Sequence, residues 1–165
     1  MDSWYQHLPA EGQIDANACW AACLRWWLFA AKSIFEDQQN LLMKYDSGED
    51  GTINEKVMRQ IIEDTQWGMT KEIFRSATNF TAKALQKHLA HGPVYVGYTE
   101  SGTRKKHVNV IYAMETSGGI TKVAVMEPQT GKEKPDCSFE GKHMVKSLRD
   151  FNRLGSVYVG SLKPR

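Results

Sequence analysis

The stretch GQIDANACWAACLRWW, residues 12–27, places a cysteine and a tryptophan where a strongly apolar segment begins. Four large apolar residues in and just after it recur at helical spacing and form one stripe: Trp20, Leu24, Trp27 and Leu28. The stripe predicts a buried helix over residues 18–31, in which Cys19 could pack as a small hydrophobic residue. Packing does not explain Gln13, a polar side chain just before the helix, so the stretch calls for a chemical explanation as well.

Length and charge limit the class of protein. A chain of 165 residues with 41% apolar residues can bury most of its surface in one core, so we predict a single domain over residues 1–165. The 21 basic and 19 acidic side chains leave a net charge of +2, which is too weak to attract nucleic acid or an anionic membrane. The longest apolar stretch is interrupted by Arg25 and is too short to cross a bilayer. We expect neither nucleic acid nor membrane as a partner.

The cysteines and the N-terminal residues indicate the cellular compartment. The chain has three cysteines, and the spacing of Cys19 and Cys23, one helical turn apart, is unlike a disulfide framework, which favours a reducing compartment. A zinc site built on that pair would need further ligands, and no nearby His or Cys pair has the spacing to supply them, so we expect no metal and no cofactor. The first residues lack the basic and apolar regions of a signal peptide. The expected location is the cytoplasm of the producer, with delivery into a target cell that needs no Sec signal.

Three further helices are expected before the period of the sequence changes. Ser33 followed by Glu36 fits a capping box that opens a helix over residues 33–45. Thr52 followed by Glu55 repeats the pattern before apolar residues at helical spacing, predicting a helix over residues 52–64, with a turn over 45–51 between the two. Residues 81–92 read as a fourth helix, stopped by a Gly-Pro pair.

The second half of the chain has the alternation typical of strands. Four β-rich runs are found at residues 93–99, 107–114, 120–127 and 155–161. Gly118-Gly119 suits a tight hairpin between the second and third runs. The polar stretch 128–150 is expected to be irregular, with one short helical turn in SLRDF, residues 147–151. Helices followed by an antiparallel sheet define an α+β domain.

The residues around Cys19 suit covalent chemistry. A helix N-terminus favours the thiolate form of a cysteine, because unpaired amides and the helix dipole stabilise an anion there. A thiolate nucleophile also needs an imidazole, a group that orients the imidazole, and donors for the oxyanion, of which a side-chain amide such as that of Gln13 can be one. Among the five histidines, only His107 begins a β run after a Gly-Pro strand.

These motifs resemble a known family. QIDANACWAA, residues 13–22, resembles the signature of papain-like cysteine peptidases, in which a glutamine precedes a Cys-Trp-Ala sequence at the start of the central helix. GPVYVGYTESGTRKKHVNVIYAM, residues 92–114, resembles the two strands that lead to the catalytic histidine in the bacterial branch, which contains double-glycine (bacteriocin-processing) and effector peptidases. VAVMEPQTG, residues 123–131, resembles the strand that ends at the third catalytic residue. The resemblance implies a papain-like fold, with the N-terminal helices packed on a C-terminal antiparallel sheet.

The resemblance also implies roles. Cys19 would be the nucleophile, His107 the base, and Gln13 an oxyanion donor together with the Cys19 amide. The third position departs from the family pattern, because Glu127 precedes the proline where Asp or Asn is usual. Glu127, expected to accept from Nδ1 of the imidazole, is favoured over Gln129.

The remaining candidates have structural interpretations. Cys23 is expected to be a packed core thiol, and His88 and His91 to cap helix carbonyls. Asn109 shares a strand face with His107 but is too close in sequence to orient it. Two histidines have no motif, His7 and His143, and the basic stretch 104–106 is expected to be a solvated loop that could also attract acidic substrate segments.

The implied function is a cysteine endopeptidase that cleaves a protein substrate, as the catalytic domain of a bacterial secreted effector or toxin. Similarity to the double-glycine branch implies cleavage after small residues such as Gly-Gly, and a toxin of this kind would have a cognate immunity protein. The same triad serves glutamine deamidases and acyl or amine transferases, and a papain-like scaffold that has lost catalysis could act as a binding module. Mass spectrometry of treated protein and alkylation of Cys19 separate these alternatives.

Overall fold

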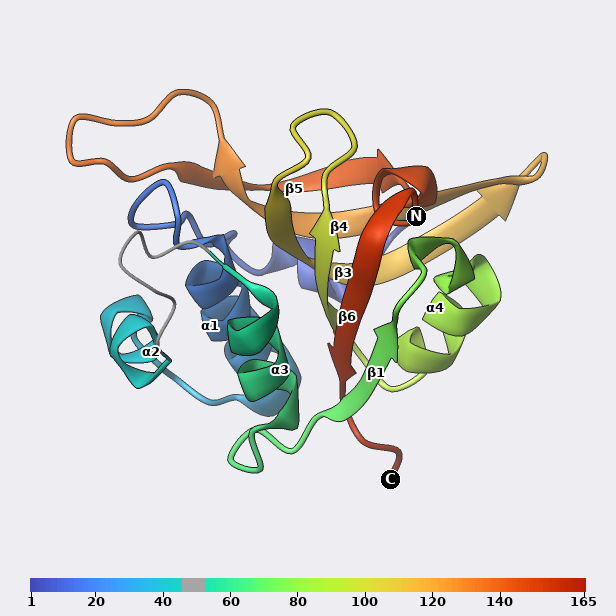
Figure 1. The fold of residues 1–165 in the computed structure, drawn as a ribbon, viewed down its shortest axis with the longest axis horizontal. Coiled ribbons are helices and arrows are strands. Elements are labelled where there is room, and N and C mark those ends of the chain that lie inside the picture. The colour runs from blue at the N-terminus through green and yellow to red at the C-terminus, as the bar shows by residue number, and fades with distance from the viewer. Residues whose placement is uncertain (46–52) are drawn as a thin grey trace.

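The computed structural model describes residues 1–45 and 53–165, in which three α-helices come first and a fourth lies between the first and second strands (Figure 1). The α-helices are α1 (Cys19–Lys32), α2 (Gln38–Lys44), α3 (Glu55–Glu63) and α4 (Ala82–Leu89). The strands are β1 (Thr70–Phe74), β2 (Val94–Thr99), β3 (Lys106–Ser117), β4 (Ile120–Thr130), β5 (Glu140–Ser147) and β6 (Leu154–Ser161). Short 3-10 helices lie at Trp4–His7, Ala77–Asn79 and Leu148–Asp150.

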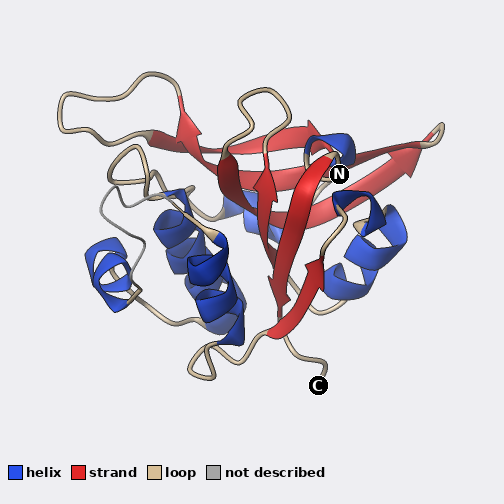
Figure 2. Ribbon diagram, viewed as in Figure 1, coloured by secondary structure: helices blue, strands red, loops and turns tan. Residues whose placement is uncertain are grey.

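The strands form one antiparallel sheet in the order β1-β6-β2-β3-β4-β5 (Figure 2). The predicted hairpin is confirmed: Ser117 pairs with Ile120, and Gly118 and Gly119 adopt φ values of 59° and 77°, which a side chain would strain. Helices packed on an antiparallel sheet make the domain α+β, as predicted.

Alternation along the strands divides the core into two layers. Val108 and Val110 of β3 pack with α1, α2 and α3 in one layer. Ile111, on the other parity, packs with Leu85 of α4 and Phe151 in the second layer. Figure 1 shows α1 and α3 on one side of the central strands and α4 on the other. Because side chains alternate along a strand, His107 lies on the same face of β3 as Ile111. Its polar side chain therefore lies on the face of the sheet that carries the second layer.

The helix boundaries correct the capping prediction for the second helix. Ser33 does not open a helix; it ends α1 in the left-handed conformation with φ 54°, and its N–H bonds to the Phe29 carbonyl. The N-cap of α2 is Asp37, four residues after the predicted cap Ser33. Its side chain accepts from the Gln39 N–H at 2.7 Å.

The third and fourth helices are confirmed. The N-cap of α3 is Asn54, whose side chain accepts from the Val57 N–H at 2.9 Å, whereas the predicted cap Thr52 and most of the predicted turn lie outside the described residues. Thr81 caps α4 through its hydroxyl.

All four predicted strands are present, but the prediction of an irregular stretch over 128–150 is wrong because it contains β5, and β1 was not predicted. Both are edge strands, so much of each lies in solvent and neither shows apolar alternation. The short helical turn predicted in SLRDF is confirmed at Leu148–Asp150. β5 matters for the site, since it supplies Lys146.

Candidate active site

Cys19 is the first residue of α1 and faces a cavity. The N-cap is Ala18, and no side chain among the described residues caps the helix. The backbone N–H groups of the first turn therefore point out of the N-terminus, where Cys19 lies. The cysteine is 5% exposed. It lines a cavity of about 410 Å³ with His107, and the other lining residues are Ala16, Asn17, Ile53, Glu100, Lys105, Lys106 and Gln129. The cavity gives a substrate access to the thiol.

His107, at the beginning of β3, joins Cys19 to Glu127. Its Nε2 donates to Glu127 Oε2 at 2.7 Å, and the ring also interacts with Cys19, which contributes to the raised pKa of His107. Since Nε2 is bonded to Glu127, Nδ1 is the ring nitrogen left to contact the Cys19 thiol. The expectation that Glu127 would accept from Nδ1 is therefore wrong, because Nε2 is the ring nitrogen that meets the carboxylate on β4.

The charge of this pair is set by its neighbours. Burial by itself lowers the pKa of His107, but hydrogen bonds and charge interactions with Cys19 and Glu127 outweigh it and raise the pKa from 6.5 to about 10. The imidazole is therefore protonated at neutral pH. A protonated imidazole beside a cysteine is the state that a thiolate–imidazolium pair requires.

Glu127, near the end of β4, uses both carboxylate oxygens. Oε2 accepts from His107 and, at 3.2 Å, from the Gln129 backbone N–H, while Oε1 accepts from Lys146 Nζ at 2.6 Å. Burial raises the pKa of Glu127, but His107 and then Lys146 lower it to about 2. Gln129, the alternative orienting residue, contributes its backbone to Glu127 and leaves its side chain exposed.

Gln13 is fully buried and lies against the end of β4. Its backbone N–H donates to the Pro128 carbonyl at 3.1 Å, and its carbonyl accepts from the Phe139 N–H at 2.9 Å. Its side-chain amide donates to the Asp15 carbonyl at 2.8 Å, whereas Oε1 has no hydrogen-bond partner among the described residues. The pairing with Pro128 brings Gln13 to the end of the strand that carries Glu127.

Gln38 of α2 holds the segment of residues 11–14 in place, and no sequence pattern predicted this role. Its amide donates to Glu11 Oε1 at 2.6 Å and to the Gly12 carbonyl at 2.8 Å, and its oxygen accepts from the Ile14 N–H at 3.2 Å. A Cβ at Gly12 would lie 2.0 Å from the Phe139 carbonyl oxygen, so the crossing of the two backbones requires glycine. A buried glutamine in a short polar helix gives no sequence signal of such a role.

The other candidates lie elsewhere. Cys23 is fully buried, bonds to the Val108 carbonyl at 3.3 Å and has a pKa raised by burial, as a core thiol should. His88 does not cap a helix; its ring joins Ser161 at 2.7 Å to Glu72 at 2.8 Å, linking α4 to two strands. His143 bonds to the Tyr112 hydroxyl and the Leu8 carbonyl.

Residues 1–45 and 53–165 contain neither a cluster of metal-binding side chains nor a membrane-spanning helix. No three His, Cys, Asp or Glu side chains in this part of the chain are grouped so that they could hold a metal ion. Within the same residues, no helix has both the length and the apolar character needed for a membrane span.

Comparisons with known proteins agree with the fold. A search of curated proteins finds no match. Among solved structures, the crystal structure of UfSP from C. elegans resembles the chain with a TM-score of 0.58 at 12% identity, over 94% of this chain and 32% of that one. The chain thus spans about a third of the structure that it resembles, and the likeness concerns the fold. The model of the family described as papain-like cysteine protease AvrRpt2 matches residues 3–146, and the chain therefore belongs to this family of cysteine peptidases.

Proposed function

We propose that Cys19, His107 and Glu127 are the triad of an endopeptidase, with Gln13 as an oxyanion donor. The observation that carries the proposal is that Cys19 and His107 line the same cavity of about 410 Å³, with His107 bonded through Nε2 to Glu127. Nucleophile, base and orienting group are the three parts that acyl transfer through a thioester requires.

The reaction follows from these positions. The Cys19 thiolate attacks the scissile carbonyl carbon, and the resulting oxyanion is stabilised by the Cys19 backbone N–H and the Gln13 amide. The His107 imidazolium gives its proton to the leaving amine, which departs and leaves a thioester on Cys19. Neutral His107 then takes a proton from water, whose oxygen attacks the thioester and releases the carboxylic acid product. Glu127 keeps the imidazole oriented throughout, since its Nε2 contact does not change.

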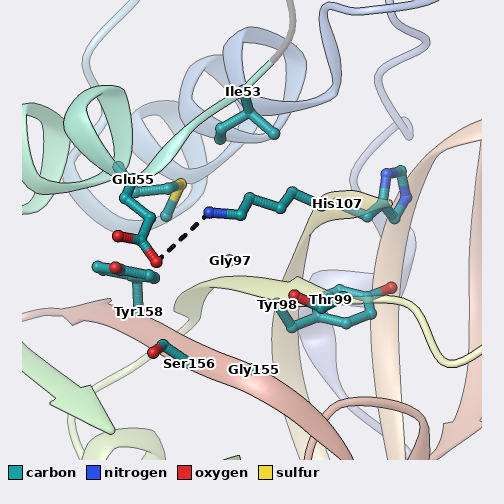
Figure 3. Close-up of a pocket in the computed structure, with 11 residues that line it drawn as sticks. Ile53, Glu55, Gly97, Tyr98, Thr99, His107, Gly155, Ser156 and Tyr158 are labelled. Carbon is teal, nitrogen blue, oxygen red and sulfur yellow. Dashed lines mark ion pairs between the residues drawn. The ribbon is translucent and has the colours of Figure 1, made fainter. Parts of the chain in front are cut away.

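A second cavity beside His107 supports the recognition of a substrate side chain. It has a volume of about 120 Å³ and shares Lys106 and His107 with the larger cavity. Figure 3 shows Ile53 and Tyr158 on its walls and an ion pair across it, between Lys106 and Glu55 at 3.5 Å. A space of this size, with apolar side chains and an ion pair on its walls, suits one small side chain near the scissile bond.

The remaining parts of the function rest on the sequence resemblance to bacterial effector and double-glycine peptidases. They are cleavage after a small residue such as glycine, action on a protein of a target cell after synthesis in the producer's cytoplasm, and restraint by a cognate immunity protein. Residues 104–106, two of which line the main cavity, would favour an acidic segment in that substrate.

The test is incubation of a candidate target proteome with the purified protein, followed by mass spectrometry of new chain termini. New termini that depend on Cys19, with small residues before the cut, support the proposal. Side-chain amides converted to carboxylates would show a deamidase, new adducts a transferase, and an unchanged proteome with every candidate target would indicate a binding module.

A further inference from the structure

Lys146 of β5 is the buried cation that completes the polar group around Glu127. Its side chain is 15% exposed. Nζ lies 2.6 Å from Glu127 Oε1, 2.8 Å from Asn109 Oδ1 and 3.3 Å from the Tyr98 hydroxyl. An ammonium group has three protons, so each has its own acceptor.

The acceptors other than Glu127 are themselves fixed. The Tyr98 hydroxyl donates to Asn109 Oδ1 at 3.0 Å, and Asn109 Nδ2 donates to the Val108 carbonyl at 2.8 Å. Burial raises the pKa of Tyr98 well above its usual value, so the phenol keeps the proton that it donates. Nζ also lies 6.0 Å from the centre of the Tyr98 ring and 5.9 Å from that of Phe151, within the range of a cation–π contact. These contacts hold the ammonium whether or not the carboxylate is present.

A glutamate at this position needs such an anchor. Its side chain has one more rotatable bond than aspartate, so a single contact with the imidazole leaves the carboxylate free to turn. With Oε1 on Lys146 and Oε2 on His107, both oxygens are held, and rotation away from the imidazole would break a buried ion pair. The charges also favour this arrangement. The positive charge of Lys146 balances the negative charge of the Glu127 carboxylate, so the imidazolium of His107 can pair with the thiolate.

We propose that Lys146 is a positioning residue for the peptidase reaction, which holds the Glu127 carboxylate in contact with His107 and allows glutamate to serve where the family uses Asp or Asn. The inference rests on the proposed triad. Lys146 touches neither the thiol nor the cavity of about 410 Å³ that Cys19 lines, so it acts through Glu127.

The experiment compares Lys146→Met, which keeps the length of the side chain and removes the charge, with Lys146→Arg and Lys142→Met. Lys142 is an exposed lysine four residues earlier on the same strand and serves as the matched control. Rates are divided by the concentration of Cys19 that a peptidyl electrophile labels, so that loss of folded protein does not count as loss of catalysis. We expect kcat of Lys146→Met to fall on the order of tenfold to a hundredfold with KM nearly unchanged, because misplacement of a catalytic group acts on the transition state. Lys146→Arg should recover part of the loss, and Lys142→Met should match wild type.

The same substitution in a Glu127→Ala background, which leaves no acceptor for Lys146 at position 127, separates positioning from general support of the fold. If Lys146 acts through the Glu127 carboxylate, Lys146→Met should cost little more once that carboxylate is gone. Equal losses in both backgrounds, or a wild-type kcat in Lys146→Met, would overturn the proposal. Failure of the triad itself would look different, since Cys19→Ala would then keep its activity whatever Lys146 does.

Discussion

His107 Nε2 lies 2.7 Å from Glu127 Oε2, so a glutamate reaches the imidazole at the position where the sequence resemblance implies Asp or Asn. The contact leaves Nδ1 for Cys19 and places the orienting group on the side of the ring away from the nucleophile. The Glu127 carboxylate stays ionised, with a pKa of about 2, because His107 and Lys146 both stabilise the anion. The departure from the family pattern is thus compatible with a working triad.

Cys19→Ala should abolish peptide cleavage while the fold is retained. In the proposed reaction this thiol forms the thioester, and it contributes little to packing volume. His107→Ala should be about as damaging, and the double variant should be no worse than either, because the two residues act as one unit. Steady-state rates on one cleavable peptide test this, with circular dichroism as the check on folding. Cleavage by pure Cys19→Ala protein would refute the assignment of the nucleophile.

Glu127→Ala should lower kcat strongly with a smaller effect on KM, because orientation of the imidazole matters most in the transition state. Glu127→Gln keeps an acceptor oxygen and should retain more activity than alanine. Gln129→Ala is the comparison, since its side chain can be removed without loss of the backbone N–H that donates to Glu127, and because this side chain lines the cavity the comparison is made on kcat. A larger defect in Gln129→Ala than in Glu127→Ala would move the orienting role to Gln129.

Gln13→Ala should reduce kcat on the order of a hundredfold, as expected for loss of one oxyanion donor of two. Gln38→Ala should destabilise the fold by about 1–3 kcal/mol, because it leaves buried polar groups of the 11–14 segment without partners. Gln38→Ala should also lower kcat by displacing Gln13, whereas Gln39→Ala, which removes the exposed side chain next to it, should do neither. Urea unfolding and steady-state kinetics of the three variants provide the measurements.

The activity should persist to high pH. His107 must carry a proton to give to the leaving amine, and its pKa is raised to about 10, so the alkaline limb of kcat/KM should lie near pH 10 rather than near 6.5. The same shift affects stability: a raised pKa in the folded state stabilises the protein fully below pH 6.5, and this contribution is lost between pH 6.5 and about 10. Free energies of unfolding at pH 6.5 and 10 should therefore fall more for wild type than for His107→Ala. An equal fall in both proteins would mean that His107 is not protonated in this way.

The sequence predicts the parts of the site that have a motif or an apolar period. Cys19 and His107 could be found because one opens an apolar helix and the other begins a β run, and the core strands alternate clearly. Lys146 and Gln38 could not, because their roles depend on contacts across the sheet and between α2 and the 11–14 segment. β5, which carries Lys146, is an edge strand whose exposed residues give no period, and a lysine in a polar stretch reads as solvated.

The central claim is that His107 activates Cys19, and selective alkylation tests it most directly. Cys137 is an exposed thiol in the same chain and Cys23 a buried one, so the protein contains its own reference groups. At neutral pH, limiting iodoacetamide followed by peptide mapping should label Cys19 faster than Cys137 despite its lower exposure, leave Cys23 unmodified, and lose the preference for Cys19 in His107→Ala while the rate at Cys137 stays the same. Faster labelling of Cys137 in the wild-type protein, or a rate at Cys19 that does not depend on His107, would contradict the account.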